Sequence, residues 1–107
     1  MTRAPTLFDR SGRAVGIVTL VRSVNCSTVW ARVILTRKLK DDTINIIIER
    51  PGDSVRVPFS IALGAANVAY GSMLSDAQSC VRAEVSLRPN DAIRNGPYSI
   101  TPCVIQN

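Results

Sequence analysis

Along much of this chain apolar and polar residues alternate at every second position, which is the pattern of a β-strand with one buried face. The clearest case is residues 80–87, where the odd positions from Val81 to Leu87 are all apolar. Clusters of Gly, Pro, Asn and Asp separate such stretches at intervals of about 8–12 residues, as in small antiparallel domains. The pattern predicts an all-β fold, a small antiparallel sandwich or barrel of roughly seven to eight short strands.

Residues 28–36 form another regular stretch and contain the only tryptophan. Their odd positions, from Val29 to Leu35, are apolar and predict the core face of a strand. Trp30 and Arg32 then lie on the opposite face, where a contact between the cation and the indole ring is expected. The favoured interpretation of Trp30 is that it covers the sheet or fills a second core, and stacking on a ligand is the alternative.

Residues 14–23 predict the preceding strand, joined to 28–36 by a short turn. Both of its faces are apolar, so neither face is expected to be freely solvated. On one side we expect Val15, Ile17 and Val21, and on the other Val18 and Leu20.

Further short apolar stretches are bounded by turn residues. They predict strands at residues 6–8, 43–49, 55–59, 68–75 and 98–105. Residues 61–67 are the one stretch where a helix competes, but their glycine and asparagine favour a loop or a single turn. Residues 1–5 have no side chains that could anchor a core, so we expect a flexible arm there and a single β domain over residues 6–107.

The chain has 13 Lys and Arg against 8 Asp and Glu, a net charge of +5. Such a surplus permits attraction to nucleic acid or to an anionic polymer of the cell envelope, and it also keeps a small domain soluble. The densest basic group is Arg37, Lys38 and Lys40, beside Asp41 and Asp42. Neighbouring acids favour a solvated turn here over a phosphate-binding patch.

The chain contains no histidine, so the commonest general base and the commonest metal ligand are both missing. A serine or cysteine nucleophile would need another base, and both lysines lie in the charged turn. The adjacent Asp41 and Asp42 lack the separation that paired catalytic acids need. We therefore expect no catalytic residues, no metal ligands, no cofactor and no enzymatic activity.

Three cysteines, Cys26, Cys80 and Cys103, are spaced without the CxxC pairs of zinc sites. Two alternatives stay open: one disulfide and one free thiol in an oxidising compartment, or three reduced thiols. No apolar run approaches the roughly 18 residues of a membrane span. The N-terminal residues do not resemble a signal peptide, so we expect a cytoplasmic protein or one whose leader has been removed.

A motif at residues 16–32 resembles a known family. It consists of Gly16, Val18, Leu20, Ser23, Cys26, Trp30, Ala31 and Arg32. It is similar to the YjfA-like group, small domains of unknown function from Gram-positive bacteria that are secreted or form extracytoplasmic parts of membrane-attached proteins. A shorter segment, Ser72-Met73-Leu74 with Asp76, resembles the Ser/Thr-Pro-Met-Val-x-Asp segment near that family's C-terminal end. The resemblance implies a fold and an extracytoplasmic or secreted location, but no reaction.

This chain departs from the family's pattern before the serine, where the family often has an Arg-Tyr pair and this chain has Val21-Arg22. It also lacks the upstream cysteine that the resemblance would pair with Cys26. A disulfide of the family's kind is therefore not implied for this chain.

Together these patterns predict a non-enzymatic domain that acts by binding or assembly, outside the cytoplasm. We expect its surface to combine Trp30 and Arg32 with Arg22 on the neighbouring strand, and its partner to be a protein or an anionic envelope polymer. Pro58 and Pro102 indicate guarded sheet edges, while an arm that adds to a neighbour's sheet would make a homo-oligomer. A basic nucleic-acid-binding barrel is the third hypothesis, less favoured because the aromatic residues are scattered along the chain.

Overall fold

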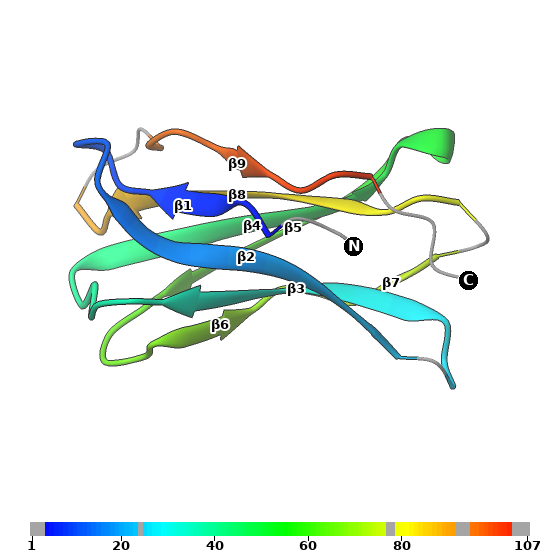
Figure 1. Cartoon of the computed structure of the whole chain (residues 1–107), viewed down its shortest axis with the longest axis horizontal. Helices are drawn as coiled ribbons and strands as arrows, with labels where there is room; N and C mark the ends of the chain where they lie inside the picture. Colours follow the sequence, from blue (N-terminus) through cyan, green and yellow to red (C-terminus); the bar gives the residue numbers. More distant parts are fainter. Residues whose placement is uncertain (1–3, 24, 77–78, 92–94, 104–107) are drawn as a thin grey trace.

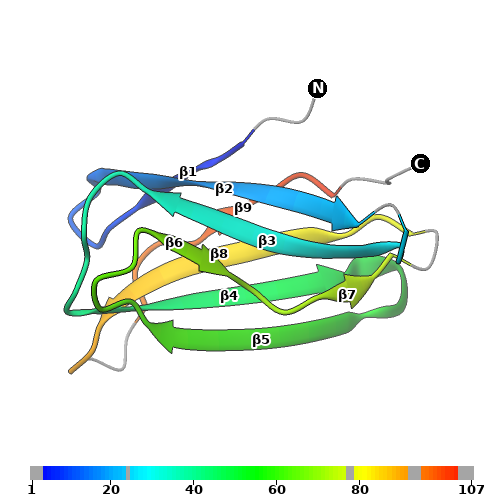
Figure 2. The same cartoon turned by 90° about the horizontal axis from the view of Figure 1, so that it is seen from below.

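The computed structural model describes residues 4–23, 25–76, 79–91 and 95–103, which fold as two antiparallel sheets lying face to face (Figure 1 and Figure 2). Sheet A contains β1 (Thr6–Phe8), β2 (Ala14–Ser23), β3 (Thr28–Leu35), β6 (Val68–Tyr70) and β7 (Leu74–Ser75). Sheet B contains β4 (Asp42–Arg50), β5 (Val55–Ala62), β8 (Arg82–Pro89) and β9 (Ser99–Ile100). The order of sheet A is β1-β2-β3-β6, with β7 also pairing with β3, and that of sheet B is β5-β4-β8-β9. The prediction of an all-β antiparallel fold is confirmed, and the fold is a sandwich.

The core lies between the two sheets, because each sheet turns one apolar face toward the other. Most of the buried side chains are β-branched or leucine, as a chain with few aromatic residues requires. The larger cluster includes Val18, Ala31 and Val33 of sheet A and Ile44, Ile46, Val85 and Leu87 of sheet B. A smaller cluster of Val29, Ile48 and Val81 lies beside it, and Leu20 packs against both.

The first strands contain an irregularity that the alternation pattern did not predict. Val15 and Val18 are both fully buried, whereas Ile17 is exposed, so the expected pairing of Val15 with Ile17 on one face is wrong. The register between β1 and β2 shifts between Leu7 and Phe8, which leaves Val15 as an extra residue on β2. A bulge of this kind breaks the two-residue period, so side chains of opposite parity reach the same face.

The predicted strand 68–75 is divided into β6 and β7, which raises the number of strands to nine among the described residues. Gly71 lies in the gap, and its backbone N–H donates to the Ala31 carbonyl at 3.0 Å. A Cβ added to Gly71 would lie 2.6 Å from Cγ2 of Ile46 in the opposite sheet. The chain therefore passes too close to the core here for any residue but glycine.

Two further boundaries differ from the sequence prediction. β5 continues to Ala62, into the stretch expected to be a loop, and pairs with β4 over its whole length. The short helical turn η1 (Pro51–Asp53) connects the two strands. Within the predicted strand 98–105 only Ser99 and Ile100 pair with β8, and residues 104–107 lie outside the described part.

Cys80 and Cys103 form a disulfide, with their Cα atoms 5.2 Å apart, and Cys26 is a free, exposed thiol. The disulfide joins the segment before β8 to the segment after β9. Of the two alternatives left open by the sequence, one disulfide with one free thiol is the one found.

Sheets A and B are also connected through the first strand. The Ser99 hydroxyl of β9 donates to the Thr6 carbonyl of β1 at 2.6 Å. The Pro5 carbonyl accepts a hydrogen bond from the Val18 amide at 3.0 Å, so the described end of the expected arm is attached to β2. Residues 1–3, the rest of that arm, lie outside the described residues.

Candidate binding surface

The outer face of sheet A is the surface on which the predicted pair, Trp30 and Arg32, lies. The buried positions of β3 are Val29, Ala31, Val33 and Leu35, so the even positions point away from the core, as predicted. Residues that are paired across antiparallel strands share a face. The register pairs Trp30 with Val21 of β2, and Arg32 with Thr19 of β2 and with Tyr70 of β6.

This outer face is largely apolar and open to solvent. Tyr70 is 55% exposed, and Met73, in the gap between β6 and β7, is 63% exposed. Ile17 and Val68 are also exposed, while Trp30 is half-buried among its neighbours. Large apolar side chains gathered on one sheet face are typical of surfaces that bind a partner.

Arg32 is the only charged residue at the outward positions of β2, β3 and β6. Its side chain is half-buried, and its Nε–H is out of reach of solvent and donates to no acceptor among the described residues. Thr19, directly opposite, donates from Oγ1 to the backbone carbonyl of Arg32 at 3.2 Å and brings no negative charge to the guanidinium. An unpaired, partly desolvated donor of this kind is rare in folded proteins and calls for an explanation.

Arg22, the third residue of the predicted surface, does not join the other two. The register pairs it with Val29, whose side chain is fully buried, so Arg22 points to the inner side of sheet A. There its guanidinium forms an ion pair with Asp76, Nη2 to Oδ2 at 3.3 Å. In the observed register each even-numbered residue of β2 is paired with an odd-numbered residue of β3, so Arg22 and Trp30 lie on opposite faces of the sheet.

The Arg22–Asp76 pair brings together two segments that are far apart in the sequence. β7 pairs with the start of β3, Thr28 opposite Ser75, and the Asp76 amide donates to the Ser27 carbonyl at 3.0 Å. Asp76 is buried, with 6% of its surface exposed. Its role as the partner of Arg22 was not identified from the sequence, although the second motif contains it.

The outer face of sheet B is different, because its charges neutralise one another. Arg82 Nε lies 2.6 Å from Glu49 Oε1, and Arg56 bridges Glu49 at 3.3 Å and Glu84 at 3.0 Å. The hydrogen bond to Glu49 raises the pKa of Arg82 above its usual range. Because these opposite charges are paired with one another, the outer face of sheet B has little unpaired charge for a partner to neutralise. The outer face of sheet A, where Arg32 is unpaired among the described residues, is therefore the better candidate for a binding surface.

No group of three His, Cys, Asp or Glu residues that could hold a metal ion occurs in the described part of the chain. The described residues also include no helix with the length and hydrophobicity of a membrane span. Comparison of the chain with protein-family models, with curated proteins and with solved structures finds no match.

Proposed function

We propose that this protein is a non-enzymatic binding domain that holds a protein partner on the outer face of sheet A. The observation that supports this proposal is Arg32, a half-buried cation without a counter-ion among the described residues, surrounded by exposed apolar side chains. Arginine and aromatic residues of this kind, clustered near the centre of a surface, are the usual hot spots of protein interfaces.

The chemistry of the surface indicates what the partner must bring. A carboxylate would form a charge-assisted pair with the Arg32 guanidinium, and apolar side chains would cover Trp30 and Tyr70. Homo-oligomer formation, the main alternative, is disfavoured on this face. A two-fold axis through its centre would place Arg32 opposite the same residue of a second copy, with no acid at the outward positions of β2, β3 and β6 to separate the charges.

An extracytoplasmic location belongs to the same proposal. The Cys80–Cys103 disulfide is compatible with it, because disulfides form and persist in oxidising compartments. The resemblance of residues 16–32 to secreted domains agrees with this location.

The proposal can be tested by selecting binders from a random peptide library displayed on phage. Peptides that bind the wild-type protein should contain an acid flanked by apolar residues. Arg32→Gln should weaken them by about tenfold, the effect of losing one charge-assisted hydrogen bond. Trp30→Ala should weaken them by roughly thirtyfold, the loss expected for a hot-spot aromatic residue.

The control is Arg56→Gln, which removes one positive charge from the outer face of sheet B and should leave the affinity unchanged. Unfolding by urea checks that each variant is folded. Binders that are unaffected by both Arg32→Gln and Trp30→Ala would contradict the proposal. A wild-type dimer in light scattering that Trp30→Ala dissociates would favour assembly instead.

A further inference from the structure

Two groups of positively charged side chains are distinguished by their partners, and Arg32 and Arg88 belong to neither. Arg22, Arg50, Arg56 and Arg82 each form an ion pair with an Asp or Glu. A second group is exposed and forms no ion pair with any described residue. We call this group the basic end, and it consists of Arg10, Arg13, Arg37, Lys38 and Lys40.

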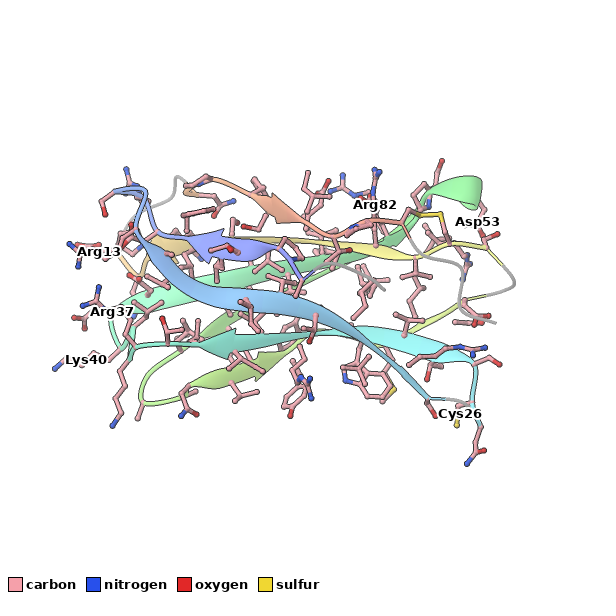
Figure 3. All side chains as sticks on the ribbon, viewed as in Figure 1. Arg13, Cys26, Arg37, Lys40, Asp53 and Arg82 are labelled. Carbon is pink, nitrogen blue, oxygen red and sulfur yellow. A yellow bond between two sulfur atoms is a disulfide. The ribbon has the colours of Figure 1, made fainter. Side chains whose placement is uncertain are left out.

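The fold gathers the basic end from two loops that are distant in sequence. Figure 3 shows Arg13, Arg37 and Lys40 at one end of the sandwich, opposite the end that contains Cys26 and Asp53. The two loops are adjacent because the Thr36 amide donates to the Val15 carbonyl at 2.9 Å, beside the β1–β2 hairpin. Leu39 packs against the core and anchors its loop, so the exposed Lys38 and Lys40 on either side of it project into solvent.

The acids at this end compensate the basic residues only in part. The Asp9 carboxylate holds the hairpin turn, accepting hydrogen bonds from the Ser11 amide at 2.9 Å and the Arg13 amide at 2.9 Å. The pKa of Asp42 is raised by burial first, and then by the charges of Asp41 and Asp9. The pKa of Asp9 is lowered first by the hydrogen bond from the Ser11 side chain and also by the charge of Arg13. The acids therefore offset part of the positive charge of the basic end, and the rest is left for an external anion.

An aromatic hollow of about 500 Å³ adjoins the basic end. It lies between β1 and β9, and Phe8 and Tyr98 line it, 41% and 44% exposed. Phe8 directly precedes the hairpin loop of the basic end. On the other side Gly96 approaches Arg10 so closely that an added Cβ would lie 2.9 Å from Arg10 Cγ. Arg10 of the basic end therefore lies beside the segment that carries Tyr98, next to the aromatic hollow.

We propose that the basic end and the aromatic hollow together bind an acidic polysaccharide of the cell envelope. Its acidic groups pair with the five cations, and a sugar ring stacks on Phe8 and Tyr98. Guanidinium groups suit this task because they present paired donors to a carboxylate or a phosphate. A polysaccharide is favoured over nucleic acid because disulfides such as Cys80–Cys103 form in oxidising compartments. This surface is separate from the outer face of sheet A, so neither proposal depends on the other.

Binding is measured by titration calorimetry with polygalacturonate, a uniformly carboxylated sugar chain, at two salt concentrations. The affinity should fall steeply with salt, because each cation that is paired releases a counter-ion. Lys38→Gln/Lys40→Gln should weaken binding about tenfold in low salt and reduce the salt slope by roughly one to two units. The matched control is Asn25→Asp/Arg56→Gln, which lowers the net charge by the same amount away from the basic end and should change neither quantity.

The aromatic hollow is tested with Phe8→Ala against two polyanions. Binding of polygalacturonate should weaken severalfold, while binding of polyglutamate, which has no sugar ring, should not change. The proposal is overturned if polygalacturonate does not bind, or if the charge-matched control weakens binding as much as the lysine variant. It is also overturned if a thymidine oligonucleotide of equal charge binds more tightly than polygalacturonate, since nucleic acid would then be the better ligand.

Discussion

Gly71 offers a direct test of how closely the two sheets are packed beside the candidate binding surface. In Gly71→Ala the new Cβ would lie 2.6 Å from Ile46 Cγ2 and 3.4 Å from Ile46 Cβ. Carbon atoms pack best at about 3.5–4.0 Å, so the closest pair is roughly 1 Å too near. Neither the Ile46 side chain nor the backbone at residue 71 can easily move aside, because Ile46 is fully buried and the Gly71 amide is hydrogen-bonded to the Ala31 carbonyl. Overpacking of this kind costs about 1–3 kcal/mol, which we expect as the loss in the free energy of unfolding by urea.

The double variant Gly71→Ala/Ile46→Ala makes the argument quantitative. Ile46→Ala alone should cost about 2–5 kcal/mol, because it leaves a cavity. The methyl group introduced by Gly71→Ala would occupy part of that cavity. The loss in the free energy of unfolding should therefore be at least about 1 kcal/mol smaller in the double variant than the summed losses of the two single variants. Gly64→Ala is the control: Gly64 has φ of +56° with no atom within 4 Å of an added Cβ, so its cost is conformational and Ile46→Ala should not relieve it. Strict additivity between Gly71→Ala and Ile46→Ala would refute the close packing.

Two further predictions concern stability. Asp42→Asn should raise the free energy of unfolding at pH 7, because burial and nearby acids raise the pKa of Asp42 in the folded state and its ionisation therefore opposes folding. The stabilisation by Asp42→Asn should disappear at pH 3, below the ordinary pKa of an aspartate, because the carboxyl is then protonated in both the folded and the unfolded state. Urea unfolding at pH 7 and at pH 3 measures this difference. An equal gain in the free energy of unfolding at the two pH values would contradict the electrostatic cause. Alkylation of the native protein should label Cys26 alone. Cys103→Ser should lower the free energy of unfolding by about 3 kcal/mol, the chain-entropy value for a loop with a sequence separation of 23, and a loss near zero would argue against the Cys80–Cys103 link.

Much of the candidate surface was predictable, because alternation along one strand is a local property. Trp30 and Arg32 were expected on the face of β3 opposite the core, and they lie there. Arg22 was expected beside them but lies on the inner side, because register decides which residues of two paired strands share a face. A shift of one residue exchanges the faces. Tyr70, now central to the surface, was not connected with Arg32, since β6 reaches β3 only through the tertiary fold.

The basic end was likewise predictable from the sequence only in part. Arg37, Lys38 and Lys40 beside two acids were interpreted as a solvated turn, and they are indeed exposed. What the linear order did not reveal is that a second loop adds Arg10 and Arg13 at the same end of the sandwich. The two loops are brought together by a hydrogen bond between segments that are distant in sequence, which the linear order does not show. The Asp9 carboxylate, by contrast, accepts hydrogen bonds within its own hairpin turn.

The amino-acid sequence by itself determined the all-β class and the approximate position of most strands, because a two-residue period and turn-forming residues act over a few neighbouring positions. The tertiary structure decided which strands pair, where the bulge at Val15 reverses the alternation, and that Cys80 pairs with Cys103. It also decided which cations have a counter-ion. These properties depend on contacts between the two sheets and between loops, and such contacts exist only in the folded protein.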